Sequence, residues 1–333
     1  MEFIGTSKLK NENQLKILSE IKQGKLLTAK QISSTVGINI VTVGTILKDF
    51  IKQDILLTKD KISQGKGRPT TQYQLNPNYF HFLSLILYRK ENKTNFILRI
   101  LDAHKNVLTF SEGVIDLVTK DGIISILNKE LHSSTIKLII ITVPAVVSND
   151  QIVESDIIEL KHMNLQKEVE EQLGISTVIK NDMNCCAQGY HLNHPIYKNI
   201  SYLLLVKDGG PGCGSIVNSQ LLEGNSQIAG EIIYLPFLEF FEKGRVDYSM
   251  ENVAKTIACL VSILNPEKIL ITGDAVVDMD ILELNSYCQK YLPSQFIPKL
   301  EMKSDYFSDY YKGINEIAIN EFWGRYSIGQ RGQ

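Results

Sequence analysis

The sequence is short of cysteine and has no long hydrophobic run. Its 333 residues include five cysteines, namely Cys185, Cys186, Cys213, Cys259 and Cys288. An odd number without paired spacing predicts reduced thiols rather than a disulfide framework. No apolar run reaches the length of a bilayer-spanning helix, and the N-terminal stretch MEFIGTSKLKNENQ lacks the apolar core of a signal peptide. These absences predict a cytoplasmic protein without membrane contact.

The composition is that of a folded, water-soluble protein with an uneven charge distribution. Hydrophobic residues make up 44% and charged residues 22%, and the length suits two or three domains. Residues 1–75 carry 12 Lys and Arg against 6 Asp and Glu, whereas the remainder carries 23 against 31. A basic head on an acidic body favours a polyanion as the partner of the head. A solvated, lysine-rich surface is the alternative interpretation.

The head begins with three predicted helices. Residues 11–23 place Leu15, Leu18 and Ile21 at helical spacing, and Gly24 ends that helix. Thr28 can cap a short second helix, AKQISSTV, which ends at Gly37, and Asn39 can cap a third, IVTVGTILKDFIKQ. The buried face of the third helix is predicted to consist of Val43, Ile46, Leu47 and Phe50. Two short helices joined by a tight glycine turn predict a helix-turn-helix.

In that geometry the start of the second helix of the motif enters the major groove of DNA. The residues expected to contact DNA from this region are Thr28, Asn39, Ile40, Val41, Thr42, Gly44, Thr45 and Lys48. Ile40 and Val41 are unusual on a solvent-facing surface, and contact with thymine methyl groups would explain them. Thr42 and Thr45 are predicted to donate to phosphates or base edges. The alternative is a plain three-helix bundle with two exposed aliphatic side chains.

A basic loop follows between two predicted strands, ILLTK and TQYQL. Its tip, Lys66, Gly67, Arg68 and Pro69, has the character of a wing. Gly67 and Pro69 would hold the backbone extended, so that Arg68 enters a narrow, A·T-rich minor groove. Lys61 and Lys66 would lie over phosphates. A simple turn without a role in binding is the alternative.

The body alternates strands with helices, which predicts an α/β architecture with two related lobes. IKLIIITVPAVV has the β-branched character of a buried strand, and NLQKEVEEQLG is an amphipathic helix. A strand, a glycine loop and a second strand follow in SYLLLVKDGGPGCGSIV. We expect the winged helix-turn-helix domain at 1–75, the first lobe at 76–190 plus 310–333, and the second lobe, with the glycine-rich loop, at 191–309.

The body resembles the ROK family of repressors, open reading frames and sugar kinases. The segments that carry the resemblance are VPAVV, ELKHMNLQKEVEEQLGISTVIKNDMNCCAQG, LLLVKDGGPGCGSIVNSQLLEG, IAGEI and LNPEKILITGD. The segment at the end of the head, GRPTTQYQLNP, resembles the repressor branch of the family. The resemblance implies an actin/hexokinase-type two-lobed body with RNase H-like lobes, preceded by a winged helix-turn-helix. It also implies sugar contacts from Asn181, Asp182 and Glu231, of which Asp182 matches the base of the family's kinases.

The chain departs from the family's kinases at two places. Their first strand carries an Asp-x-Gly turn for metal and phosphate, whereas FHFLSLILYRKENKTNF has neither a glycine nor an acidic residue in the strand. The family's zinc site needs a histidine where this chain has Tyr234, and LPFLEFFEKGRVDYSMENVA contains no cysteine. The glycines at 209, 210, 212 and 214 remain, so their amides could still meet a phosphate. We expect no catalytic residues, no ATP use and no zinc or other metal.

Together these patterns predict a DNA-binding transcriptional regulator that senses a carbohydrate and is not an enzyme. A homodimer or homotetramer would present paired heads to a pseudo-palindromic operator with an A·T-rich element. Closure of the lobes on the sugar would shift the heads. An ATP-dependent sugar kinase, a constitutive repressor with an inactive pocket and a regulator controlled by a protein partner are the alternatives.

Overall fold

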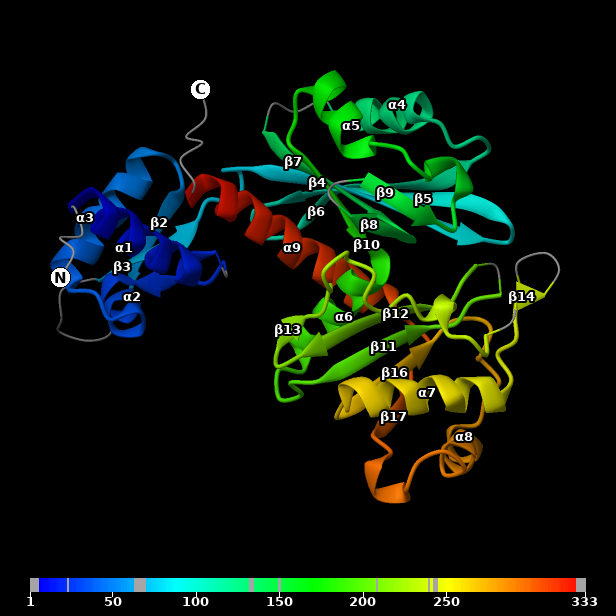
Figure 1. Cartoon of the computed structure of the whole chain (residues 1–333). Coiled ribbons are helices and arrows are strands. Elements are labelled where there is room, and N and C mark those ends of the chain that lie inside the picture. Colours follow the sequence, from blue (N-terminus) through cyan, green and yellow to red (C-terminus); the bar gives the residue numbers. More distant parts are fainter. Residues whose placement is uncertain are drawn as a thin grey trace.

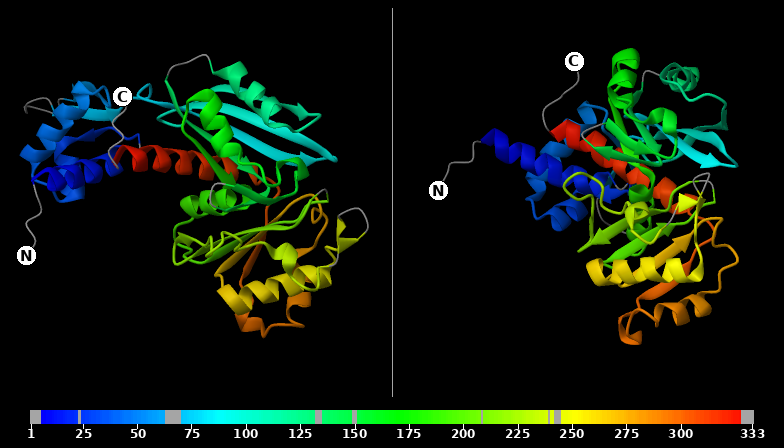
Figure 2. Two further views of the ribbon diagram at one scale, coloured as in Figure 1. Left: turned by 45° about the horizontal axis from the view of Figure 1, so that its top comes forward. Right: turned by 45° about the vertical axis from the view of Figure 1, so that its right-hand side comes forward.

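The computed structural model describes residues 6–22, 24–62, 70–131, 135–148, 151–207, 209–238, 240–241 and 245–327. A small head lies beside a body of two lobes, and one long helix, α9 (Phe307–Ser327), runs from the body to the head (Figures 1 and 2). The predicted α/β class is confirmed. The predicted domain boundaries stay a prediction.

The head consists of three helices and a small antiparallel sheet. The helices are α1 (Thr6–Ile21), α2 (Ala29–Val36) and α3 (Ile40–Lys52). The strands β1 (Leu27–Thr28), β3 (Thr70–Leu75) and β2 (Leu56–Ile62) lie side by side in that order. The predicted core of α3 is confirmed, since Val43, Ile46, Leu47 and Phe50 are all buried. One expectation was wrong: Leu15 is 38% exposed, because Ile17, Leu18 and Ile21 form the buried side of α1.

Helices α2 and α3 are bent by 117° from each other, which lies within the range of a helix-turn-helix. Thr28 and Gln31 form a capping box at the start of α2, and Asn39 accepts a hydrogen bond from the N–H of Val41 at the start of α3. Gly37 between them has a φ of 69°, which glycine adopts without strain. Among the described residues, no single helix is long and apolar enough to cross a membrane; only this bent pair, taken together, has the length and composition.

The first lobe is built on a five-stranded sheet with the order β10-β7-β4-β5-β6. Strands β4 (His81–Lys90), β5 (Lys93–Asp102) and β6 (Val107–Ile115) form an antiparallel meander, while β7 (Ile136–Val143) and β10 (Thr177–Asn181) run parallel. Helices α4 (Lys120–Glu130) and α5 (Leu165–Leu173) cover one face of this sheet (Figure 1). The hairpin of β8 (Ala145–Ser148) and β9 (Gln151–Ser155) leads to the short helix η1 (Ile158–Leu160).

The second lobe repeats this plan with the order β13-β12-β11-β16-β17. Its strands are β11 (Ile200–Leu204), β12 (Gly212–Val217), β13 (Gln220–Leu221), β16 (Lys268–Thr272) and β17 (Lys299–Met302). Helices α7 (Met250–Leu264) and α8 (Ile281–Cys288) pack on one face. The lobe also contains η2 (Ile232–Tyr234), η3 (Ser294–Phe296) and the small pair β14 (Phe240–Phe241) and β15 (Arg245–Val246).

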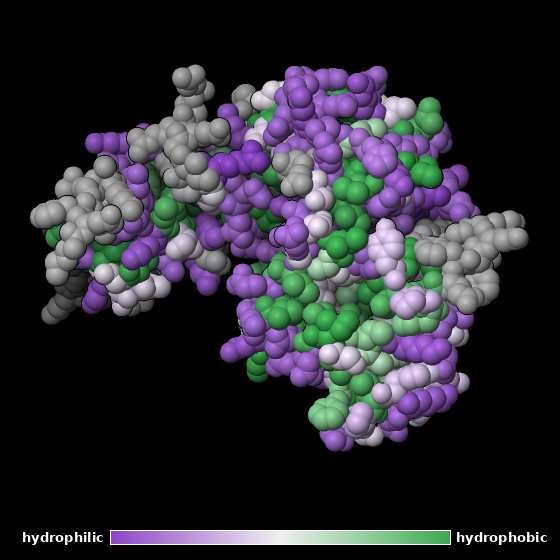
Figure 3. Space-filling view, viewed as in Figure 1, coloured by the Kyte–Doolittle hydropathy of each residue, from purple (hydrophilic) through white to green (hydrophobic). Residues whose placement is uncertain are grey.

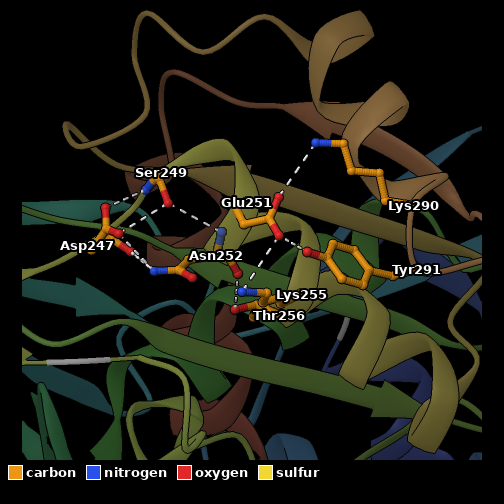
Figure 4. A network of polar contacts seen from close by, with 8 residues as sticks. All are labelled: Asp247, Ser249, Glu251, Asn252, Lys255, Thr256, Lys290 and Tyr291. Carbon is orange, nitrogen blue, oxygen red and sulfur yellow. Dashed lines mark hydrogen bonds and ion pairs between the residues drawn. The ribbon is translucent and has the colours of Figure 1, made fainter.

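A polar network fixes the start of α7 (Figure 4). Ser249 caps the helix, and its own N–H donates to Asp247 at 2.9 Å. The amide of Asn252 donates to the same carboxylate at 3.0 Å. In the first turn of the helix, Glu251 pairs with Lys290 at 3.7 Å. These contacts tie α7 to the segment that follows α8, so the outer layer of the second lobe is held as one unit.

The two lobes meet through α6 (Asp182–Asn193) and α9, which cross in close contact. A side chain on Gly189 would come within 1.8 Å of the carbonyl oxygen of Asp309, and one on Gly313 within 1.9 Å of that of Cys185. Such contacts are impossible, so glycine is needed at both positions. The helix pair therefore forms a tightly packed core at the junction of the lobes.

Candidate functional site: a central cavity lined by carboxyl groups

A cavity of about 280 Å³ opens between the lobes, near the N-terminus of α6. All three residues predicted to bind a ligand, Asn181, Asp182 and Glu231, line it. They come from the end of β10, the first residue of α6 and the loop before η2. The tertiary structure thus brings together residues that lie about 50 positions apart in the sequence. Figure 3 shows a band of hydrophobic residues across the face where the lobes meet.

Asn181 holds the turn between β10 and α6. Its side-chain oxygen accepts a hydrogen bond from the N–H of Asn184 at 2.9 Å, which caps α6. Its amide nitrogen donates to the carbonyl oxygen of Ala145 at 2.9 Å. With both polar groups engaged, Asn181 acts mainly by positioning its neighbour, Asp182, at the cavity wall.

Among the acids of the cavity, Asp182 has the pKa that lies furthest from its ordinary value. Its carboxylate accepts a hydrogen bond from the N–H of Met183 at 2.8 Å. Burial raises the pKa of Asp182 to about 8, and the negative charges of Asp156 and Glu231 add to this, against the stabilising Met183 hydrogen bond. Burial and Asp156 likewise raise the pKa of Glu231 to about 7. Two acids that are partly protonated near neutral pH can accept or donate hydrogen bonds, which suits the hydroxyl groups of a sugar.

Sequence reasoning missed two more carboxyl residues of the lining, Glu154, which pairs with Lys161 at 2.8 Å, and Asp156. Asp156 follows β9 in the first lobe, yet its carboxylate accepts a hydrogen bond from the N–H of Gly210, in the glycine loop of the second lobe, at 3.0 Å. A side chain on Gly209 would lie 2.8 Å from the same carboxylate. Burial raises the pKa of Asp156, whereas the Gly210 hydrogen bond and the charge of Arg89 lower it. An amide of the glycine loop, which could have met a phosphate, therefore binds a carboxylate of its own chain.

Tyr88 and Arg89, at the end of β4, also line the cavity. The guanidinium of Arg89 donates to the carbonyl oxygen of Asn92 at 3.1 Å and so stiffens the β4–β5 hairpin. Tyr234, in place of the zinc-binding histidine of the family, also lines the cavity. Over the described ranges, no group of three or more His, Cys, Asp or Glu could hold a metal ion. Tyr234 and the described residues around it therefore do not fit the zinc site of the family.

The second candidate surface is the start of α3 in the head. Val41 is 74% and Ile40 49% exposed, and Asn39, Thr42, Thr45 and Lys48 are exposed as well. The hydroxyl group of Thr45 donates to the carbonyl oxygen of Val41 at 3.1 Å, so it is already engaged. Thr28 is engaged in the capping box. The predicted wing tip, Lys66, Gly67, Arg68 and Pro69, lies outside the described residues.

Comparison with known proteins bears on both surfaces. Residues 103–237 match the model of the ROK family. The chain contains a ROK family domain. That domain spans the end of the first lobe's meander, Asp156, Asp182, the glycine loop and Glu231, and so includes every acid of the cavity.

Two curated proteins that are similar to this chain are named as repressors. The "Xylose repressor" of Staphylococcus xylosus is 23% identical over 271 residues, which cover 77% of this chain and 68% of that protein. The "Xylose repressor" of Bacillus subtilis (strain 168) is 25% identical over 259 residues, covering 70% and 62%. The chain thus spans about two thirds of the length of these relatives.

Solved structures agree with the predicted fold. A ROK family transcriptional regulator, described as a homologue of the E. coli MLC protein, superposes with a TM-score of 0.72 at 15% identity, over 96% of this chain and 99% of that one. The ROK hexokinase from Thermus thermophilus gives 0.59 at 15% identity, over 74% and 100%. The predicted actin/hexokinase-type two-lobed fold is confirmed.

Proposed function

We propose that this protein is a transcriptional repressor that binds double-stranded DNA through its head and responds to a sugar in the central cavity without phosphorylating it. The DNA-binding part depends on one observation, the exposure of Ile40 and Val41 at the start of α3 in a bent helix pair. Exposed aliphatic side chains are unfavourable in water, and in a major groove they would contact thymine methyl groups. The relatives named as repressors support this assignment.

The sugar-binding part rests on Asp156, Asp182 and Glu231 in the central cavity. Hydroxyl groups of a sugar would hydrogen-bond to Asp182 and Glu231, each of which otherwise remains buried near the charge of Asp156. Because two relatives are named xylose repressors, xylose is the first sugar to test. The absence of phosphorylation is supported by Asp156, since its carboxylate would repel a phosphate at the amide of Gly210.

A homodimer would present two heads to a pseudo-palindromic operator. The outer strand of the first lobe, β6, offers a surface for a second copy, because Leu108, Phe110 and Val114 are exposed on an edge strand. Such a row of hydrophobic side chains on a sheet edge is a favourable site for association. Closure of the lobes on a sugar would move α9 and, through it, the spacing of the two heads.

A mobility-shift assay with duplexes selected from a random pool tests the DNA-binding part. Val41→Glu places a negative charge at the proposed DNA surface and should lower affinity at least ten-fold, without unfolding the head, because Val41 is 74% exposed. Val277→Glu is the matched control, since Val277 is 70% exposed in the second lobe. Equal DNA affinity of the two variants would refute the assigned surface, and so would failure of the wild type to select any duplex.

A sugar kinase is the second candidate, favoured by the raised pKa of Asp182, which could act as a base toward a sugar hydroxyl. Phosphoryl transfer also needs groups that position and neutralise the phosphates, and β4 carries no acidic residue. An assay of ATP consumption with xylose and a panel of hexoses decides between the two. Turnover that is lost in Asp182→Asn would replace the repressor-sensor proposal by a kinase.

A further inference from the structure

A second cavity, of about 760 Å³, lies along α6 beyond the central cavity, between α6, α9 and the β12–β13 hairpin. We call it the hinge cavity, because α6 and α9 join the two lobes. Asn181 lies in the wall of both cavities, and every other residue of the two linings differs. The volume lies in the range of ligand pockets, roughly 300–1,000 Å³.

Carboxamide side chains dominate the polar wall of the hinge cavity. The six are Asn181, Asn184, Gln188, Gln220, Gln227 and Asn320. Asn181 and Asn320 are engaged within the protein, whereas the other four offer donors and acceptors that match hydroxyl groups, which both donate and accept. The charged residues of the wall balance, with Lys180 and Arg325 against Glu223 and Glu321. A wall without net charge favours a neutral ligand over an ion.

Two polar atoms at this wall have no hydrogen-bond partner among the described residues. They are the side-chain oxygen of Asn184 and Nδ1 of His191, both buried. Buried polar groups are nearly always paired, by protein, water or ligand. Both atoms are covered by neighbouring atoms, so an occupant of the hinge cavity would reach them only after a rotation of the Asn184 or His191 side chain.

The hinge cavity also contacts the segment that carries the head. Asn320 lines the cavity, and its side-chain oxygen accepts a hydrogen bond from the ammonium group of Lys22, at the end of α1, at 2.6 Å. One turn later in α9, Trp323 stacks on Tyr79 with ring centroids 5.9 Å apart. An occupant that displaced Asn320 would thus act on the last turns of α9, where they pack against the chain leaving the head.

We propose that the hinge cavity is a second binding site, for a neutral, hydroxyl-rich small molecule, and that its occupation is transmitted to the head through Asn320. The site is distinct from the central cavity and its ligand binds without Asp182 or Glu231. Binding can be measured on the protein free of DNA, so the outcome does not depend on whether the head binds an operator.

The test uses the full chain carrying Asp182→Asn, which impairs the central cavity. Xylose, glucose, sucrose and inositol are the neutral probes, with gluconate and glucose 6-phosphate as charged analogues. Binding is followed by equilibrium dialysis and by the fluorescence of Trp323, the single tryptophan of the chain. We expect at least one neutral probe to bind saturably and to bind at least ten-fold more weakly after Gln188→Leu. Gln172→Leu, at an exposed position of α5, is the matched control and should have no effect.

Three results would overturn the proposal. No neutral probe binds the Asp182→Asn protein, or binding is unchanged by Gln188→Leu, or only the charged analogues bind. Transmission to the head is tested separately with Lys22→Met, which removes the contact to Asn320. That variant should bind the probe normally while its affinity for DNA no longer changes with the probe; an unchanged response of DNA affinity would exclude Asn320 as the link.

Discussion

Replacing Asp182 with asparagine should make the ligand-free protein more stable at high pH and change little at low pH. The carboxyl group has a pKa of about 8 in the folded protein, against 3.8 as its ordinary value. Between these two values the folded protein holds a proton that the unfolded chain has lost. The free energy of unfolding therefore falls as the pH rises through this window. Asparagine stays neutral, so the variant does not suffer this loss.

The size of the effect follows from the pKa difference. A shift of about four units corresponds to roughly 6 kcal/mol at most, at about 1.4 kcal/mol per unit. Because the carboxyl group faces a cavity open to water, we expect about 2 kcal/mol at pH 9. Asparagine can still accept the hydrogen bond from the N–H of Met183, so the turn into α6 should be preserved. The variant should thus melt about 3–6 °C above the wild type at pH 9.

Thermal unfolding of both proteins without sugar, at pH 5 and pH 9, measures this difference. Asp278→Asn, at an exposed position of the second lobe, is the matched control and should follow the wild type. Melting temperatures of wild type and Asp182→Asn that change in parallel with pH would show that the Asp182 carboxyl is not held protonated by the fold.

Two further predictions concern the cavity and the hinge. The pKa values of Asp182 and Glu231 are raised to about 8 and about 7, and sugar hydroxyl groups donate hydrogen bonds to the charged carboxylates. Sugar binding should therefore release protons, and the affinity for sugar should increase from pH 6 to pH 8. Titration calorimetry in two buffers measures the proton release, and an affinity that stays constant with pH would contradict the prediction. Gly313→Ala should lower the free energy of unfolding by several kcal/mol, because the new side chain would lie 1.9 Å from the carbonyl oxygen of Cys185. Gly324→Ala on the same helix is the control: its side chain would meet nothing within 4 Å, so the stability should be unchanged or slightly higher. Equal melting temperatures of the two variants would refute the tight packing of α6 and α9.

Local features were predicted well because their causes lie within a few residues. The cap at Thr28, the glycine turn at Gly37 and the buried face of α3 depend on neighbours three or four positions away. The candidate acids Asp182 and Glu231 were found through their motifs, which keep their order in the sequence. Leu15 was misplaced because periodicity alone does not decide which neighbouring stripe of α1 faces the rest of the head.

By itself, then, the sequence determined the order of strands and helices, the exposed start of α3 and two acids of the central cavity, because periodicity, caps and motifs are local. Only the tertiary structure decided which residues share a wall. Asp156 contacts Gly210 across 54 positions, and Lys22 contacts Asn320 across 298. No pattern along the chain marks such pairs, since they form where separate lobes pack together. The physical reason is that burial and charge compensation act through space, and the fold alone sets those distances.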